Sequence, residues 1–193
     1  YIMIPMDDVQ KNHLKSYGIA YYALEKRIEV DWLLNYRGGA FALKLSDDVL
    51  KECKVRGVTF EIIADIQYNK IITDITRPEI NQDVMKLEKA PKIAVYSPKN
   101  KQPWDDAVTL VMTYAEIPYE VVYDEEIIND ELAQYDWLHL HHEDFTGQYG
   151  KFWSSYKNVA WFQEYVRFNE SLAGKLGFSK VSELKLAVAL KIK

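Results

Sequence analysis

Short apolar runs alternate with a helical pattern in the second half of the chain. Runs typical of buried strands occur at residues 92–96, 119–123 and 135–141. Between the first two runs, apolar residues recur at helical spacing until Pro118 ends the pattern. The strand–helix–strand unit has about the thirty residues of a right-handed parallel crossover, so we expect a parallel sheet.

The first half of the chain shows similar patterns. Strands are predicted at residues 2–6, 30–34, 40–43 and 58–63, and helices at residues 10–26 and 47–55. Arg37-Gly38-Gly39 predicts a tight hairpin turn, and Arg56-Gly57 is typical of a glycine C-cap. Residues 65–89 are expected to be helical or irregular.

After residue 150, aromatic residues among polar ones predict a helix or helix pair packed on the sheet, and residues 182–193 predict an amphipathic helix. Together these elements indicate a single three-layer α/β domain, residues 1–193, with a largely parallel sheet and strand–helix–strand modules 1–89 and 90–193. Because no strand follows the last helix, we expect this chain to be part of a longer one.

Composition excludes some functional classes. The 193 residues carry a formal net charge of -5 with acidic and basic residues interspersed, which argues against a nucleic-acid partner. No apolar stretch approaches the roughly 18 residues of a membrane span, and no signal-peptide pattern is present. The single cysteine, Cys53, falls inside a predicted helix, where a packing residue is favoured over a nucleophile.

Histidines and carboxylates gather at the end of the predicted strand 135–141. His139 and His141 share one face of that strand, roughly 6.5–7 Å apart, a spacing that allows a shared divalent metal. Alternatively, His141 or His142 is a general base whose tautomer is fixed by Glu143. Asp144 follows as a ligand-binding candidate at the carboxyl end of the strand, where open α/β sheets bind ligands. A buried His139 with one good hydrogen bond is the third reading, and no cofactor is identified.

A second polar group follows the first predicted strand. It contains Asp7, Asp8, Gln10, Asn12 and His13, which would line the same crevice if that strand were parallel to the others. The interpretation we favour is that Asp7 or Asp8 caps the first helix and that His13 lies one turn inside it.

The loop after residues 92–96 holds Lys99, a candidate anion contact, and Trp104. Trp104, Trp137, Trp153 and Trp161 are either core residues or part of a carbohydrate-binding surface, and a contiguous exposed patch would favour the second interpretation.

Several long stretches resemble a known family. They are residues 4–7 with 10–15, 34–39, 98–106 and 135–151. They are similar to exported Bacteroidota proteins automatically labelled asparagine synthetase B, which resemble class I glutamine amidotransferase-like domains. The resemblance covers nearly the whole chain and implies a flavodoxin-like fold and a periplasmic or cell-envelope location. Within or beside these stretches, the ligand-binding candidates are Asp7, His13, Arg37, Gly38, Gly39, Lys99, Trp104 and Asp144.

Two functions stay open. The first is a binding or structural role in the envelope, with a glycan or a larger envelope assembly as partner. The second is an amidotransferase-like or hydrolytic enzyme whose nucleophile lies beyond Lys193. The first is favoured because residues 1–193 contain no Gly-x-Ser-x-Gly elbow and no phosphate-binding glycine loop.

Overall fold

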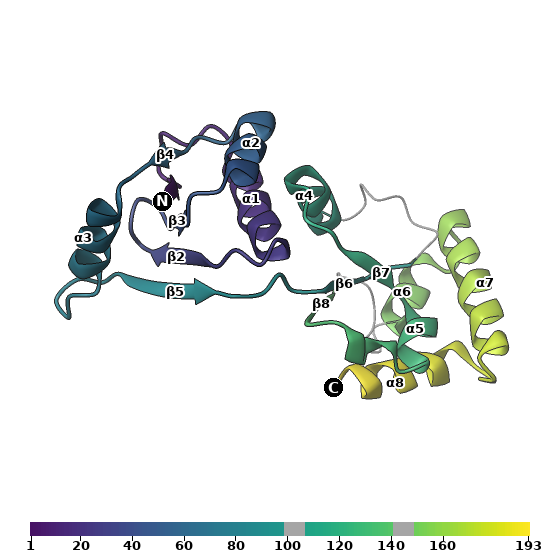
Figure 1. The fold of residues 1–193 in the computed structure, drawn as a ribbon. Coiled ribbons are helices and arrows are strands. Elements are labelled where there is room, and N and C mark those ends of the chain that lie inside the picture. Colours follow the sequence, from purple (N-terminus) through teal and green to yellow (C-terminus); the bar gives the residue numbers. More distant parts are fainter. Residues whose placement is uncertain (99–106, 141–148) are drawn as a thin grey trace. The chain divides into compact units, whose positions relative to one another are not determined.

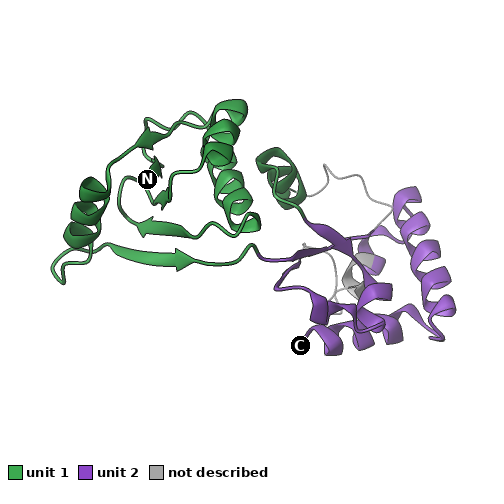
Figure 2. Cartoon of the chain, in the orientation of Figure 1, with its two compact units in different colours: residues 1–90, 107–118 green, residues 91–106, 119–193 purple. Residues whose placement is uncertain are grey.

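The computed structural model describes residues 1–98, 107–140 and 149–193, and the chain forms two compact units. Unit 1 contains residues 1–90 and 107–118, and unit 2 contains residues 91–106 and 119–193 (Figure 2). The expected boundary between modules 1–89 and 90–193 lies beside the first junction of the two units. Segment 107–118 belongs to unit 1 by its contacts, although its neighbours in sequence belong to unit 2.

Unit 1 is built on a five-stranded sheet in which every neighbouring pair is antiparallel (Figure 1). In the order across the sheet, the strands are β4 (Glu61–Ile62), β1 (Ile2–Ile4), β3 (Ala40–Leu43), β2 (Val30–Leu34) and β5 (Asp83–Leu87). Strands β1 and β2 run in the same direction and are connected through helix α1 (His13–Glu25), but β3 lies between them. The sheet therefore contains a split strand–helix–strand unit with a hairpin strand inserted.

Different helices cover the two faces of this sheet, because successive side chains of a strand point to opposite faces. Ile4 and Phe41 belong to the core formed with α1 and α2 (Asp47–Arg56). Met3 and Ala42 belong to the core formed with α3 (Asp65–Ile75). The central strands β1 and β3 are thus buried on both sides, which explains their continuous apolar sequences.

Helix α4 (Ala107–Ala115) packs on α1 within unit 1. At the crossing, Gly18 lies so close to the carbonyl group of Ala115 that a Cβ atom at position 18 would collide with it. Lys15 Nζ also lies 3.0 Å from Glu116 Oε1. The helix expected between the first two parallel strands is confirmed, and α1 is its packing partner.

Unit 2 is built on a three-stranded parallel sheet with the order β7-β6-β8. The strands are β6 (Ile93–Tyr96), β7 (Glu120–Val122) and β8 (Trp137–Leu140). The helical elements are α5 (Asp124–Ile128), the 3₁₀ helix η2 (Glu131–Gln134), α6 (Tyr149–Tyr156), α7 (Ala160–Lys175) and α8 (Val181–Ile192). Buried residues of β6, α5, α7 and α8 form its core, among them Tyr96, Ile127, Ala173 and Leu184.

The structure confirms the α/β class and the parallel strands of the second half, but the expectation of one largely parallel sheet is wrong for unit 1. There the turn at Arg37-Gly38-Gly39 returns the chain beside β2, and such short connections join only antiparallel strands. Residues 65–89 also include β5, an edge strand with three of its five residues exposed and therefore a weak apolar pattern. Within the three described ranges, no helix combines the length and apolarity needed to cross a membrane.

Candidate functional site

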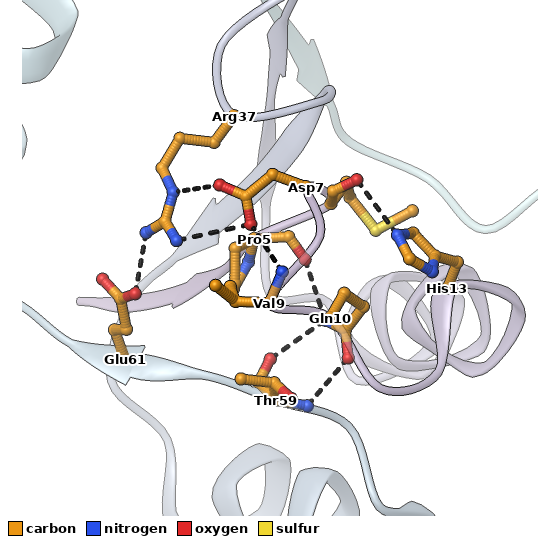
Figure 3. A network of polar contacts seen from close by, with 9 residues as sticks. Pro5, Asp7, Val9, Gln10, His13, Arg37, Thr59 and Glu61 are labelled. Carbon is orange, nitrogen blue, oxygen red and sulfur yellow. Dashed lines mark hydrogen bonds and ion pairs between the residues drawn. The ribbon is translucent and has the colours of Figure 1, made fainter.

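A charged cluster lies where the chain leaves β1, and Figure 3 shows its contacts. Arg37 Nε donates to Asp7 Oδ2 at 2.7 Å, and Arg37 Nη1 donates to Glu61 Oε1 at 2.7 Å. The three side chains come from the β1–α1 connection, the β2–β3 turn and β4, so the ion pairs join three separate segments. All three are partly exposed, with side-chain exposures of 34%, 25% and 46% for Asp7, Arg37 and Glu61.

The cluster is electrostatically matched. The hydrogen bond from Arg37 holds the pKa of the Asp7 carboxyl below its ordinary value. Hydrogen bonds to Asp7 and then Glu61 raise the pKa of the Arg37 guanidinium, which therefore stays charged. Because one cation is shared by two carboxylates, the net charge of the cluster is about -1, and its arginine is committed to internal partners.

The β2–β3 turn that carries Arg37 depends on its two glycines. Arg37, Gly38 and Gly39 all have positive φ, at 46°, 78° and 93°. A Cβ atom at position 38 would collide with the carbonyl group of Met6. The backbone N–H of Met6 donates to the Arg37 carbonyl at 3.0 Å, so the turn packs directly on the end of β1. Gly38 is therefore required by backbone approach and backbone conformation together.

Two further polar residues, one in the β1–α1 connection and one at the start of α1, are fixed by internal contacts. The Gln10 side chain is buried, and its amide group donates to the carbonyls of Pro5 and Thr59 at 2.8 and 3.1 Å. His13 Nε2 lies 3.1 Å from the Met6 carbonyl oxygen, which can only accept, so Nε2 carries a proton. The geometry indicates a scaffold that holds the loop in place.

The preferred helix-capping interpretation is wrong in detail. Asn12 is the N-cap of α1, since its side chain accepts from the backbone N–H of Lys15 at 3.2 Å. His13 is the first residue of the helix, and Asp7 lies well before it. Asp7, His13, Arg37, Gly38 and Gly39 were predicted from separate stretches, and the structure brings all five into this one region of unit 1.

His139, in contrast, lies on β8 in unit 2, with its ring 6.3 Å from the Trp137 ring. The remaining candidates lie outside the described residues: Lys99, Trp104, His141, His142, Glu143 and Asp144. In the part of the chain that is described, no group of three or more His, Cys, Asp or Glu side chains is arranged to hold a metal ion.

A buried charge network lies at the carboxyl edge of the parallel sheet, and the sequence predictions did not include it. Lys185 Nζ lies 2.9 Å from Asp124 Oδ2, and the two side chains are 3% and 0% exposed. This contact is an ion pair without hydrogen-bond geometry at Oδ2. Lys185 Nζ donates to the Tyr123 hydroxyl at 2.7 Å, and the Tyr96 hydroxyl donates to Asp124 Oδ1 at 2.6 Å.

The network connects three helices to two strand ends. Tyr96 is the last residue of β6, and Tyr123 and Asp124 directly follow β7. Burial raises the pKa of Tyr123, so its hydroxyl stays protonated and donates to Asn169 Oδ1 of α7 at 3.1 Å. Lys185 contributes the contact from α8. Such a network fixes the geometry of the sheet edge, since each buried polar group needs its partner.

The sequence does hold a signal for this network. Val181, Leu184, Lys185 and Val188 follow the i, i+3, i+4, i+7 spacing of one helix face, and all four are buried. A lysine on the apolar stripe of an amphipathic helix requires a buried partner, which indicates a carboxylate elsewhere.

Comparisons of this chain with protein-family models, with curated proteins and with solved structures find no match.

Proposed function

We propose that this chain is a ligand-binding protein of the cell envelope, with its ligand site at the carboxyl ends of β6 and β8. The exported location and the similarity to class I glutamine amidotransferase-like, flavodoxin-like domains, both implied by the sequence resemblance, are part of this proposal. Binding is favoured over catalysis because, in the charged cluster of unit 1, Arg37 is paired with Asp7 and Glu61 and serves the scaffold.

The observation that supports the location is the strand order of unit 2. The chain passes from the central strand β6 to β7 on one side, and then crosses to β8 on the other side. The carboxyl ends of β6 and β8 therefore flank a topological switch point, where open parallel sheets bind ligands. Register supports this, because Tyr96 and Leu140, the last residues of the two strands, are direct partners.

The ligand-binding candidates follow these two strands in sequence. Lys99 and Trp104 follow β6, and His141 and Asp144 follow β8. A cation and an indole after one strand, with imidazole and carboxylate after the other, suit a small polar ligand. A divalent metal shared by His139 and His141 is a finer form of the same proposal, since imidazole is a common ligand of zinc.

The experiment is a thermal-shift titration of the purified chain with four probes: Zn²⁺, inorganic phosphate, L-glutamine and N-acetylglucosamine. We expect at least one probe to raise the melting temperature of the wild type, and the shift to be lost in the double variant His141→Ala, Asp144→Asn. Lys157→Ala, an exposed change between α6 and α7, is the control and should keep the shift.

Three outcomes contradict the proposal. Stabilisation by Zn²⁺, phosphate or L-glutamine that survives in the double variant places the ligand elsewhere. The absence of any shift with all four probes removes the support for ligand binding. Sustained release of ammonia from L-glutamine by the wild type assigns catalysis to the chain in place of binding alone.

A further inference from the structure

A pocket of about 300 Å³ lies in unit 2 between α6, α7 and the start of α8. Trp153 of α6 forms one wall, Glu170 and Ala173 of α7 form another, and residues 179–182 complete it. Its volume is at the lower limit for pockets that hold small organic ligands, roughly 300 Å³. None of these residues takes part in the proposed site after β6 and β8.

Trp153 belongs to a cluster of aromatic rings, three of which are partly exposed. Trp153, Tyr156 and Trp161 are 45%, 41% and 55% exposed, although aromatic rings of this size are usually well buried. The buried Phe162 connects them, since its ring centroid lies 6.2, 6.5 and 5.6 Å from those of the three rings. Phe162 is 1% exposed and so provides a fixed base for the exposed rings. An exposed apolar surface that is held in place in this way indicates a binding surface.

Besides the apolar Ala173 and Val181, four polar residues line the pocket, and their two charges are of opposite sign. Ser179 and Ser182 bring hydroxyl groups, Glu170 brings a carboxylate, and Lys180 brings an ammonium group. Hydroxyls, carboxylates and ammonium groups together can both donate and accept hydrogen bonds. A flat aromatic wall beside such groups suits a ligand with one apolar face and several hydroxyl groups, and the balanced charge favours a neutral one.

An anion is less well matched, although the pocket reaches the start of α8. The Glu183 carboxylate already lies there, because its Oε2 accepts from the backbone N–H of Ser179 at 3.2 Å. The negative charge of Glu183 therefore satisfies a donor that would otherwise face an anion. Glu170, on the neighbouring wall, also repels a negative ligand.

We propose that this pocket and the adjoining aromatic surface bind a sugar unit of a neutral glycan. The apolar face of the sugar ring packs on the Trp153 indole, and its hydroxyl groups bond to Ser182 and Glu170. Tyr156 and Trp161 extend the surface for the neighbouring sugars of the chain. This site is separate from the one proposed at the sheet edge, so either can fail without the other.

The test is a glycan array that contains neutral and acidic oligosaccharides, followed by calorimetric titration with the neutral oligosaccharide that binds best. We expect the wild type to prefer neutral glycans, and Trp153→Ala to weaken binding about tenfold or more. Trp137→Ala is the matched control, because Trp137 is 47% exposed in the same unit and does not line the pocket. It should bind as the wild type does.

A second variant separates binding from folding. Ser182→Ala removes one hydroxyl from an exposed position and should weaken binding severalfold while the melting temperature stays unchanged. The proposal is overturned if no neutral glycan binds, if acidic glycans bind better, or if folded Trp153→Ala binds as tightly as Trp137→Ala.

Discussion

Removing the cation of the buried network is the sharpest test of the structure of unit 2. Lys185→Met keeps most of the unbranched apolar stem of the side chain but leaves Asp124 as a buried charge without its cation. The Tyr123 hydroxyl loses the hydrogen bond from Lys185 in the same change. Breaking a buried ion pair by removing one partner costs about 3–5 kcal/mol. For a chain of 193 residues this corresponds to a melting temperature lower by on the order of 10 °C.

A matched control comes from an exposed ion pair in the same unit. Lys175 Nζ lies 2.7 Å from Glu125 Oε1, and the two side chains are 65% and 35% exposed. Lys175→Met should cost less than about 1 kcal/mol, because solvent screens an exposed pair. The two lysine variants make the same chemical change and differ in the burial of the partner.

The assay is urea unfolding followed by tryptophan fluorescence. Four of the five tryptophans belong to unit 2: Trp104, Trp137, Trp153 and Trp161. The signal therefore reports mainly on the unit that contains the network. A double variant, Lys185→Met with Asp124→Asn, should recover at least half of the loss, because the asparagine carbonyl is neutral and still accepts from Tyr96. Equal costs for Lys185→Met and Lys175→Met would refute the buried network.

Three further predictions concern unit 1. Gly38→Ala should lower the free energy of unfolding by several times the ~1 kcal/mol expected for Gly57→Ala. Both glycines have positive φ, but only at Gly38 would an added Cβ atom collide with backbone atoms. The midpoints of urea unfolding of the two variants measure this difference. Because Arg37 lowers the pKa of Asp7, their ion pair stabilises the fold at pH values above the ordinary Asp pKa of 3.8, and this stabilisation is lost as the pH falls through the lowered pKa. The difference in unfolding free energy between wild type and Arg37→Gln should therefore shrink below about pH 4. A difference that does not depend on pH would contradict the pairing. Burial raises the pKa of Cys53 to about 11, so an aromatic disulfide reagent should label the thiol only after unfolding, and rapid labelling of the native chain would be inconsistent with the structure.

Local patterns predicted most elements well because their causes are local. β2 and β3 begin and end where the apolar runs predict, and the helix that Gly57 ends by a left-handed cap was read from its glycine. The sheet order could not be read in this way. It depends on pairing between segments far apart in sequence, such as Ile4 with Phe41, and strands as short as β4 carry little pattern.

The same distinction applies to the candidate sites. Asp7 and Arg37 were each selected from their own stretch, but their ion pair depends on how β1 pairs with β3, which neither stretch reveals. The Lys185–Asp124 pair is a stronger case, because its two residues come from α8 and α5 and neither has a distinctive sequence environment apart from the helix face. Ion pairs between segments far apart in sequence therefore cannot be predicted from local patterns in this chain.

The packing of α4 on α1 has a consequence for how the chain can be divided. The polypeptide passes between the two units after residues 90, 106 and 118, so neither unit is a single continuous piece. Ending an expression clone at residue 90 would leave the Gly18 surface of α1 without α4, and starting one at residue 91 would carry α4 along without its partner. During synthesis, unit 1 is complete only after residue 118 has left the ribosome, when β6 of unit 2 has already been made. Folding of the two units is thus interleaved in time as well as in sequence.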